Sequence, residues 1–281
     1  MRRSSHFERL LLLPLVVVLL QAEADGHEGL EIRIAELTER FAQTADGEIL
    51  VRRADLHRRH RDWRSAASDL ERATELGAPE SKVRLVRAML LLDQHQAARA
   101  LEVLDGLDTV PALFLRARAF ASLGKVNQAS AAFARAIAAS NPPLPEQFIE
   151  HAQLLAGAEP PRIAEAMQVI TLGLKTLGPV ISLNEEAFGL ERQLDPAAAL
   201  RRVRAVNRGD SPSNPRWLLR EVEVLLDLKE NDQAATAIAH AKAQLAALPA
   251  RRRTTPAIRE IDSRLDHLAK LLAGPECGGG G

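Results

Sequence analysis

Two histidines three residues apart are the first side chains in this sequence whose chemistry could support a reaction. His57 and His60 flank two arginines in the segment HRRH, and Asp55 stands just before them. An imidazole beside a carboxylate can act as a general base in hydrolysis. Zinc-binding helices more often carry H-E-x-x-H with a third ligand, which is not the arrangement here. We therefore expect His57 to pack in a core, and a small helical hydrolase using His57 or His60 with Asp55 is kept as an alternative.

Other reactive motifs are missing from the sequence. It contains no G-x-S-x-G nucleophile turn, no G-x-x-x-x-G-K-[ST] phosphate loop and no G-x-G-x-x-G fingerprint. Its single cysteine, Cys277, allows neither an internal disulfide nor a C-x-x-C-H haem attachment. We expect no catalytic residue, no metal site and no cofactor.

Arginine runs are the second chemical signal. The run from Arg58 to Arg64 has acidic residues close by, which predicts solvated helix faces with ion pairs. Arg251, Arg252 and Arg253 have no acidic neighbour before Glu260, so they are the secondary candidates for contact with an anion. Lys plus Arg and Asp plus Glu are both 37, so no global charge favours nucleic acid.

The first 24 residues have the pattern of a secretory signal peptide. Arg2 and Arg3 precede an apolar run from Leu10 to Leu20, and Ala22-Glu23-Ala24 forms a small-x-small cleavage site. The run is shorter than the roughly 18–20 residues that span a bilayer. We expect export through a Sec-type signal to the periplasm or the medium, with the mature chain starting near Asp25. An uncleaved membrane anchor is the alternative.

The elements that position these side chains are predicted to be helices. Hydrophobic residues make up 46% of the chain, aromatic residues 3%, and Tyr is absent, while Ala and Leu are abundant. Ala and unbranched side chains lose little conformational freedom in a helix, so this composition favours an all-α fold with a packed core.

Small and large apolar residues recur at a period of about 34 residues. The first copy has its small residues at Ala54, Ala66 and Ala73, and later copies keep the order in phase. The full set is Leu50, Ala54, Ala66, Leu70, Ala73; Arg84, Ala88, Ala100, Leu104, Leu107; Leu113, Ala117, Ala129, Phe133, Ala136; and Leu218, Val222, Ala234, Ile238, Ala241. Two antiparallel helices approach closely where small side chains face each other, which explains the spacing. Ser65 is expected on the exposed side of this register.

At these residues the chain resembles the tetratricopeptide repeat family. The best copy runs from Leu50 through Trp63 to Pro79, and the third copy adds Gly124 at the usual turn glycine. Arg53, Arg87 and Arg116 stand where the family usually has Leu, and Arg61 replaces the turn glycine. The resemblance implies a right-handed α-solenoid of about six helix pairs.

The expected domain boundaries follow from this resemblance and from the apolar stripes at both ends. A signal peptide covers 1–24, an N-terminal capping helix 25–46, the repeats 47–247, a C-terminal capping helix 254–273 and a tail 274–281. The leading stripe is Leu30, Ile34, Leu37 and Phe41, and Asp46-Gly47 is expected to close its helix. Capping helices with one polar face prevent end-to-end stacking.

In the resembled family, first helices line a concave surface that holds peptides or partner domains. The corresponding groove residues here are Val51, Asp55, Leu85, Met89, Leu92, Phe114, Arg118, Leu219 and Glu223. Leu85, Met89, Leu92 and Phe114 would form an apolar contact patch or, equally, part of the core. Of the residues that a carboxylate clamp requires, only Arg118 is in place.

The sequence therefore predicts an exported scaffold or adaptor that binds another protein or peptide through the concave face of a solenoid. Nucleic acid is not expected as a partner, and membrane contact is expected only if the signal segment is retained. The alternative is a structural or assembly subunit held at the membrane by that segment. The identity of the partner does not follow from the sequence.

Overall fold

The computed structural model describes residues 13–207 and 214–273, with side chains from residue 29 onward. The start of the expected signal peptide (1–12), part of the polar turn at 209–215 and the tail with Cys277 lie outside the described residues. Within these ranges every regular element is a helix. The chain divides into two compact units, Met1–Ser140 and Asn141–Gly281.

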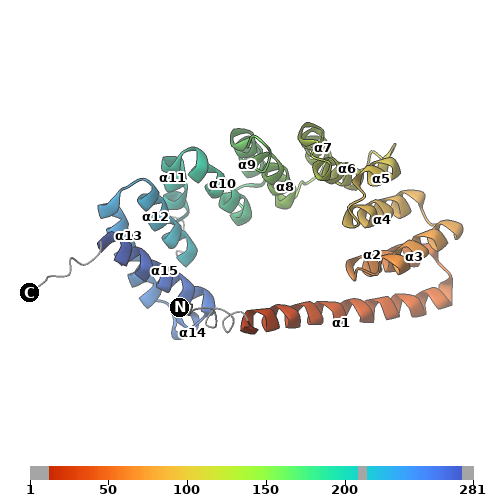
Figure 1. Ribbon diagram of the computed structural model, residues 1–281, viewed down its shortest axis with the longest axis horizontal. Coiled ribbons are helices and arrows are strands. Elements are labelled where there is room, and N and C mark those ends of the chain that lie inside the picture. Colours follow the sequence, from red (N-terminus) through yellow and green to blue (C-terminus); the bar gives the residue numbers. More distant parts are fainter. Residues whose placement is uncertain (1–12, 208–213, 274–281) are drawn as a thin grey trace, which may run out of the picture. The chain divides into compact units, whose positions relative to one another are not determined.

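Unit 1 consists of one long helix followed by three helix pairs (Figure 1). The long helix α1 covers Leu13–Thr44 and packs against α2. The pairs are α2 (Gly47–Arg59) with α3 (Trp63–Glu75), α4 (Glu80–Asp93) with α5 (Ala97–Leu104), and α6 (Val110–Ser122) with α7 (Val126–Ala139). Each pair is joined by a short turn, so that its two helices run antiparallel.

Unit 2 repeats this plan with three further pairs and a helical end. The pairs are α8 (Pro145–Ala156) with α9 (Ile163–Leu177), α10 (Ile181–Leu194) with α11 (Pro196–Asn207), and α12 (Pro215–Asp227) with α13 (Asn231–Ala246). The short helix α14 (Ala250–Arg253) and the helix α15 (Pro256–Ala273) follow. The described residues thus contain the expected six pairs, and α15 packs on α12 and α13 as an end helix.

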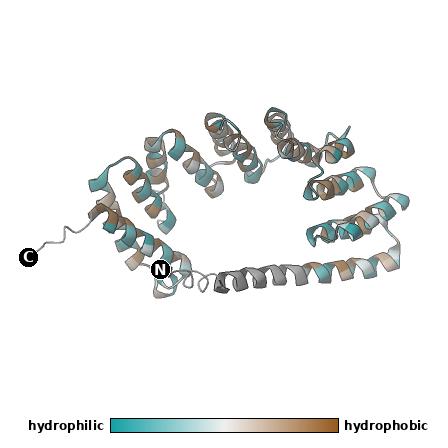
Figure 2. Cartoon of the chain, viewed as in Figure 1, coloured by the Kyte–Doolittle hydropathy of each residue, from teal (hydrophilic) through white to brown (hydrophobic). Residues whose placement is uncertain are grey.

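The small residues of the predicted period are buried where helices meet. Ala54, Ala66 and Ala73 have no exposed surface, and the corresponding residues of the other copies are buried as well, except for the half-buried Leu107. Figure 2 shows that the described helices carry both hydrophobic and hydrophilic residues, as helices that pack on one side do. Gly173 is an extreme case, because a Cβ there would lie 2.9 Å from Cγ of Phe148.

Three arginines of unit 1, of which Arg53 and Arg116 stand at family leucine positions, bind groups on neighbouring helices. Arg53 of α2 makes two hydrogen bonds to the Asp69 carboxylate of α3, at 2.8 and 2.6 Å. Arg116 of α6 donates to the Leu104 carbonyl at the end of α5, at 2.8 Å. Arg84 of α4 donates to the carbonyl of Val103, which also lies at the end of α5. Guanidinium groups from both flanking helices therefore satisfy carbonyl groups that the C-terminus of α5 leaves unpaired.

Two local expectations were wrong. Asp46-Gly47 does not close α1: Ala45 ends that helix with a φ of 52°, and Asp46 caps α2 by accepting the N–H of Glu48 at 2.8 Å. Ser65 is half-buried rather than exposed, and its backbone N–H donates to the carboxylate of Asp62, the N-cap of α3, at 3.1 Å.

The ends of the described chain also differ from the expected boundaries. Helix α1 begins at Leu13, so it is longer than the expected capping helix 25–46, and α14 is an additional helix. The stripe Leu30, Ile34, Leu37 and Phe41 is half-buried along α1, as its spacing predicts. None of the described helices is both long and apolar enough to cross a membrane.

Candidate protein-binding surface

A pocket in unit 1 brings four of the predicted groove residues together. It has a volume of about 550 Å³ and lies among α1, α2 and α4. The four residues are Val51, Asp55, Leu85 and Met89, and the other lining residues are Arg33, Glu36, Leu37, Arg40, Arg52, Leu56, Arg59, Lys82 and Val86. First helices of two successive pairs thus form one concave surface, with α1 as an additional wall.

The floor of this pocket is apolar. Val51, Leu56 and Val86 are buried, whereas Leu85 and Met89 are half-buried. Met89 packs partly against the cores of both neighbouring pairs and still reaches the pocket. A methionine fits irregular partner surfaces because its chain is unbranched and polarizable. The pocket therefore offers apolar contact area that does not require the core to open.

The rim of the pocket is basic. Arg33, Arg40 and Arg52 are exposed, and none has an ion pair or a side-chain hydrogen bond to another described residue. The other rim cations are engaged: Arg59 pairs with Asp55 at 2.8 Å, and Lys82 pairs with Glu48 at 2.7 Å.

The remaining predicted groove residues of unit 1 lie outside this pocket. Leu92 lines a different pocket of about 980 Å³, beside Trp63 and His95. Phe114 is half-buried and packs on Phe133 with the ring centres 6.0 Å apart. Arg118 is exposed on α6. Of the expected apolar patch, Leu85 and Met89 thus line the pocket, whereas Leu92 and Phe114 do not.

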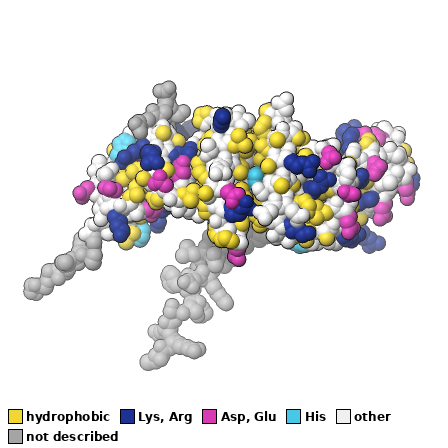
Figure 3. Space-filling view, turned by 90° about the horizontal axis from the view of Figure 1, so that it is seen from above, with side chains coloured by type: hydrophobic (Ala, Val, Ile, Leu, Met, Phe, Trp, Pro, Cys, Tyr) yellow, Lys and Arg dark blue, Asp and Glu magenta, His cyan; other side chains and the backbone are white. Residues whose placement is uncertain are grey.

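The predicted residues of unit 2 have other surroundings. Leu219 is half-buried against the core that joins α12, α13 and α15. The Glu223 carboxylate lies 3.6 Å from Arg192 and 3.7 Å from Arg264, so it belongs to an ion-pair network. Arg251, Arg252 and Arg253 form most of α14 and are exposed. Across the described surface seen in Figure 3, basic and acidic side chains alternate rather than forming a field of one sign.

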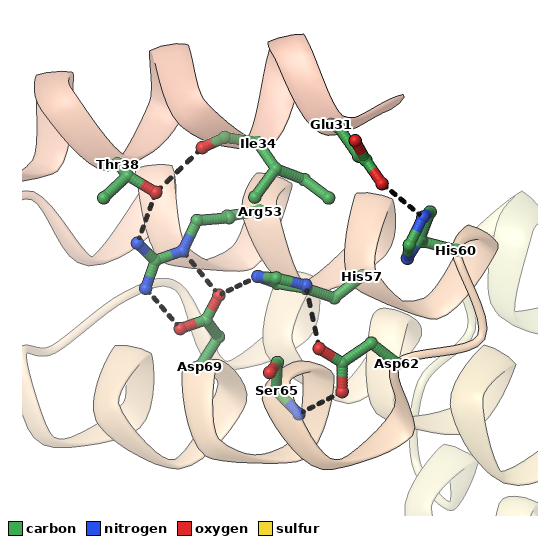
Figure 4. Close-up of polar contacts among 9 residues, drawn as sticks. All are labelled: Glu31, Ile34, Thr38, Arg53, His57, His60, Asp62, Ser65 and Asp69. Atoms are coloured by element: carbon green, nitrogen blue, oxygen red, sulfur yellow. Dashed lines mark hydrogen bonds and ion pairs between the residues drawn. The ribbon is translucent and has the colours of Figure 1, made fainter. Parts of the chain in front are cut away.

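His57 belongs to a polar network that joins α1, α2 and α3, and His60 makes a separate contact with Glu31 of α1 (Figure 4). His57 lies 3.6 Å from Asp62 and 3.9 Å from Asp69, and burial lowers its pKa. Asp55 instead pairs with Arg58 and Arg59. The carboxylate that the hydrolase alternative would pair with a histidine is thus held by two arginines.

The same network attaches α1 to the first helix pair. Arg53 donates to the Thr38 hydroxyl at 2.9 Å, and His60 lies 3.5 Å from Glu31. Figure 4 shows Thr38 and Glu31 on α1 facing the α2 side chains. Among the described residues no group of three His, Cys, Asp or Glu side chains is placed to hold a metal ion.

Sequence reasoning missed the contribution of α1 to the pocket. Arg33 and Arg40 stand on either side of Leu37 of the apolar stripe. Basic residues flanking an apolar stripe were the feature of the sequence that could have indicated a basic pocket wall. It also missed a pocket of about 770 Å³ in unit 2. That pocket lies between α10 and α11, and both Ile181, which is 69% exposed, and Trp217 line it.

No protein-family model matches the sequence, and a search of curated proteins gives no match. A search of solved structures gives matches at low sequence identity, and tetratricopeptide repeat proteins are among them. A repeat protein of Parabacteroides merdae is 15% identical over 92% of this chain and 98% of that one, with a TM-score of 0.46. Pseudomonas aeruginosa pilF is 13% identical over 77% and 96%, with a TM-score of 0.49. The TPR2AB domain of yeast Sti1, in complex with an Hsp90 peptide, is 17% identical over 88% and 96%, with a TM-score of 0.34.

The fold itself is established by the chain's own helix pairs. Short turns join the helices of each pair, and fully buried alanines such as Ala54, Ala66 and Ala100 let their backbones approach closely. Successive pairs then bury the face that each leaves open. Each of the two units is accordingly an all-α stack of tetratricopeptide-like helix pairs.

Proposed function

We propose that the protein is an interaction scaffold that binds a protein or peptide partner in the unit 1 pocket. The observation that carries this proposal is a concave pocket with an apolar floor, in which Leu85 and Met89 are half-buried. Interfaces obtain most of their binding energy from a few apolar or aromatic anchors in such pockets.

The test is recovery of the partner from the native compartment by cross-linking. Changing Leu85 and Met89 together to Ser removes apolar contact area and should lower recovery by more than about tenfold. Met89→Lys is the second variant, because its aliphatic stem still covers the core while its charge enters the pocket. Leu271→Ser is the matched control, since Leu271 is 63% exposed on α15.

Thermal unfolding of each variant separates loss of binding from loss of fold. If the folded Met89→Lys variant recovers partner as well as the natural chain, the pocket is not the binding site. Phe114→Ser is tested separately because Phe114 lies apart from the pocket. A loss with Phe114→Ser alone would place the binding surface at α6.

We also propose that the scaffold works outside the cytosol after removal of residues 1–24. Support comes from Arg2 and Arg3, the short apolar run and the small-x-small site before Asp25. Cleavage there would leave the apolar stripe of α1 and its pocket residues in the mature chain. N-terminal sequencing of the exported protein should begin at or near Asp25. A full-length species found only in membranes would instead support an anchored assembly subunit.

A further inference from the structure

We infer that the occupant of the unit 1 pocket is an acidic amphipathic helix of a partner protein. Its apolar side chains would lie on the pocket floor, and its carboxylates would pair with Arg33 and Arg40 of α1 and Arg52 of α2. This inference rests on the proposed function, because it names the chemistry of the partner at the same site.

Charge is the first argument. Three exposed arginines on the rim have no side-chain partner among the described residues. Of the two acidic residues that line the pocket, only Glu36 likewise has no side-chain partner among the described residues. Elsewhere in the same helices, Arg53 and Arg58 are bound by carboxylates. A partner with carboxylates would therefore neutralise cations that the described part of unit 1 leaves unpaired.

Spacing is the second argument, and it favours a helix. Arg33 and Arg40 are seven residues apart on α1, which places them on one face at a rise of about 10.5 Å. Glutamates at positions i and i+7 of a helix lying alongside α1 have the same rise. An extended strand presents side chains on one face at intervals of about 6.6 Å, so its carboxylates would not match both arginines.

Glu36 adds a restriction on the ligand. It stands between the two arginines on α1 and lines the same pocket. A carboxylate opposite Glu36 would be repelled, so the partner helix should carry a neutral or basic residue midway between its two glutamates. Leu37 and Met89 would then contact the apolar side chains that lie on one face of the partner helix.

The test uses the full chain and two synthetic helical peptides of about 18 residues. Both carry one leucine stripe. The first has Glu at i and i+7 beside the stripe, and the second has Lys at those two positions. Fluorescence anisotropy of the labelled peptides measures affinity at low and at physiological salt.

The acidic peptide should bind the natural chain, and Arg33→Glu with Arg40→Glu should weaken it by at least about tenfold. The lysine peptide should prefer that double variant to the natural chain. Arg64→Glu with Arg216→Glu is the control with the same change in net charge, at exposed sites outside the pocket. It should leave the affinity within about twofold.

The outcomes separate this inference from the proposed function. Equal binding of both peptides, unaffected by reversal at Arg33 and Arg40, would overturn the acidic ligand while an effect of Met89→Lys would keep the pocket. Equal weakening by the control variant would show a nonspecific charge effect and overturn the inference. Absence of acidic-peptide binding also overturns it, and the proposed function then stands or falls on partner recovery alone.

Discussion

At the scale of single residues, the pair of Arg53 and Asp69 departs furthest from the repeat pattern. The two side chains are 17% and 9% exposed, and Arg53 of α2 donates two hydrogen bonds to the Asp69 carboxylate of α3. Arg53 also reaches the Thr38 hydroxyl and lies 5.8 Å from the centre of the Phe41 ring. An ion pair therefore joins α2 to α3 where the resembled family usually has a leucine. The same arginine also connects these helices to α1.

Removing one partner of this pair should destabilise the fold more than removing both. Asp69→Leu leaves a poorly solvated guanidinium, so we expect the free energy of unfolding to fall by about 2–4 kcal/mol. The double change of Arg53 and Asp69 to Leu should recover most of that loss, because two apolar side chains pack without a desolvated charge. Urea unfolding of the natural chain, both single variants and the double variant measures the coupling. Additive losses would contradict the prediction.

His151 should make unit 2 sensitive to acid. Burial, with a smaller effect of the nearby Arg162 guanidinium, lowers the pKa of His151 to about 4 from 6.5. Its neutral form is therefore favoured in the fold, and the associated stability is present above pH 6.5. As the pH falls from 6.5 toward 4, the unfolded chain binds a proton that the folded chain does not.

The expected loss of stability over this interval is up to about 3 kcal/mol. His151→Gln should remove this dependence, because the amide does not titrate. His267→Gln, at an exposed position of α15, should retain it. The measurement is the midpoint of urea unfolding at several pH values between 4 and 7. Parallel pH profiles for both variants would show that another group is responsible.

At the scale of elements, four of the six turns within the described pairs share one backbone conformation with different residues. The turn position has a positive φ at Arg61 (61°), His95 (58°), Gly124 (68°) and Lys229 (61°). Glycine adopts this conformation without a steric penalty, whereas other residues are strained by their Cβ. The third pair therefore has the residue that its turn requires, and three other pairs tolerate strain.

Arg61→Gly should stabilise the protein by about 0.5–1 kcal/mol, because it removes that strain between α2 and α3. Gly124→Ala is the reverse change at the equivalent turn and should destabilise by about 1 kcal/mol. Thermal unfolding of both variants beside the natural chain provides the comparison. A destabilising Arg61→Gly would mean that the arginine side chain makes a compensating contribution.

At the scale of the whole molecule, the helix pairs within each unit contact chiefly their neighbours along the chain. Stability of such repeat stacks is the sum of the pairs and their nearest-neighbour interfaces, so damage should remain local. The two compact units provide a direct way to observe this, because each has its own buried residues.

Ala66→Arg should open the first pair without opening unit 2. Ala66 has no exposed surface where α2 meets α3, so a long charged side chain cannot fit there. Hydrogen exchange should show lost protection in α2 and α3, with α12 and α13 unchanged. Ser68→Arg, at an exposed position two residues away, should be nearly silent. Loss of protection spread equally over both units would contradict this local behaviour.

The sequence by itself determined the helical class, the six pairs and the buried alanines. These follow from local periodicity, because a residue such as Ala54 or Ala66 must be small wherever two helices cross. The family resemblance implied nine groove residues, and four of them, Val51, Asp55, Leu85 and Met89, line one pocket. The prediction for Asp46 was wrong because it considered only the helix before this residue. Asp46 instead caps the next helix, where its carboxylate accepts a backbone N–H.

Only the tertiary structure decided which arginines are engaged and which remain on the pocket rim. Arg53 and Arg33 both lie within helices predicted from the sequence. In the structure α3 supplies a carboxylate to Arg53, whereas no described side chain pairs with Arg33. Charge pairing depends on the positions of side chains from several helices, which no period within one helix specifies. The pocket has the same origin, because its wall and floor come from three helices that meet only after packing.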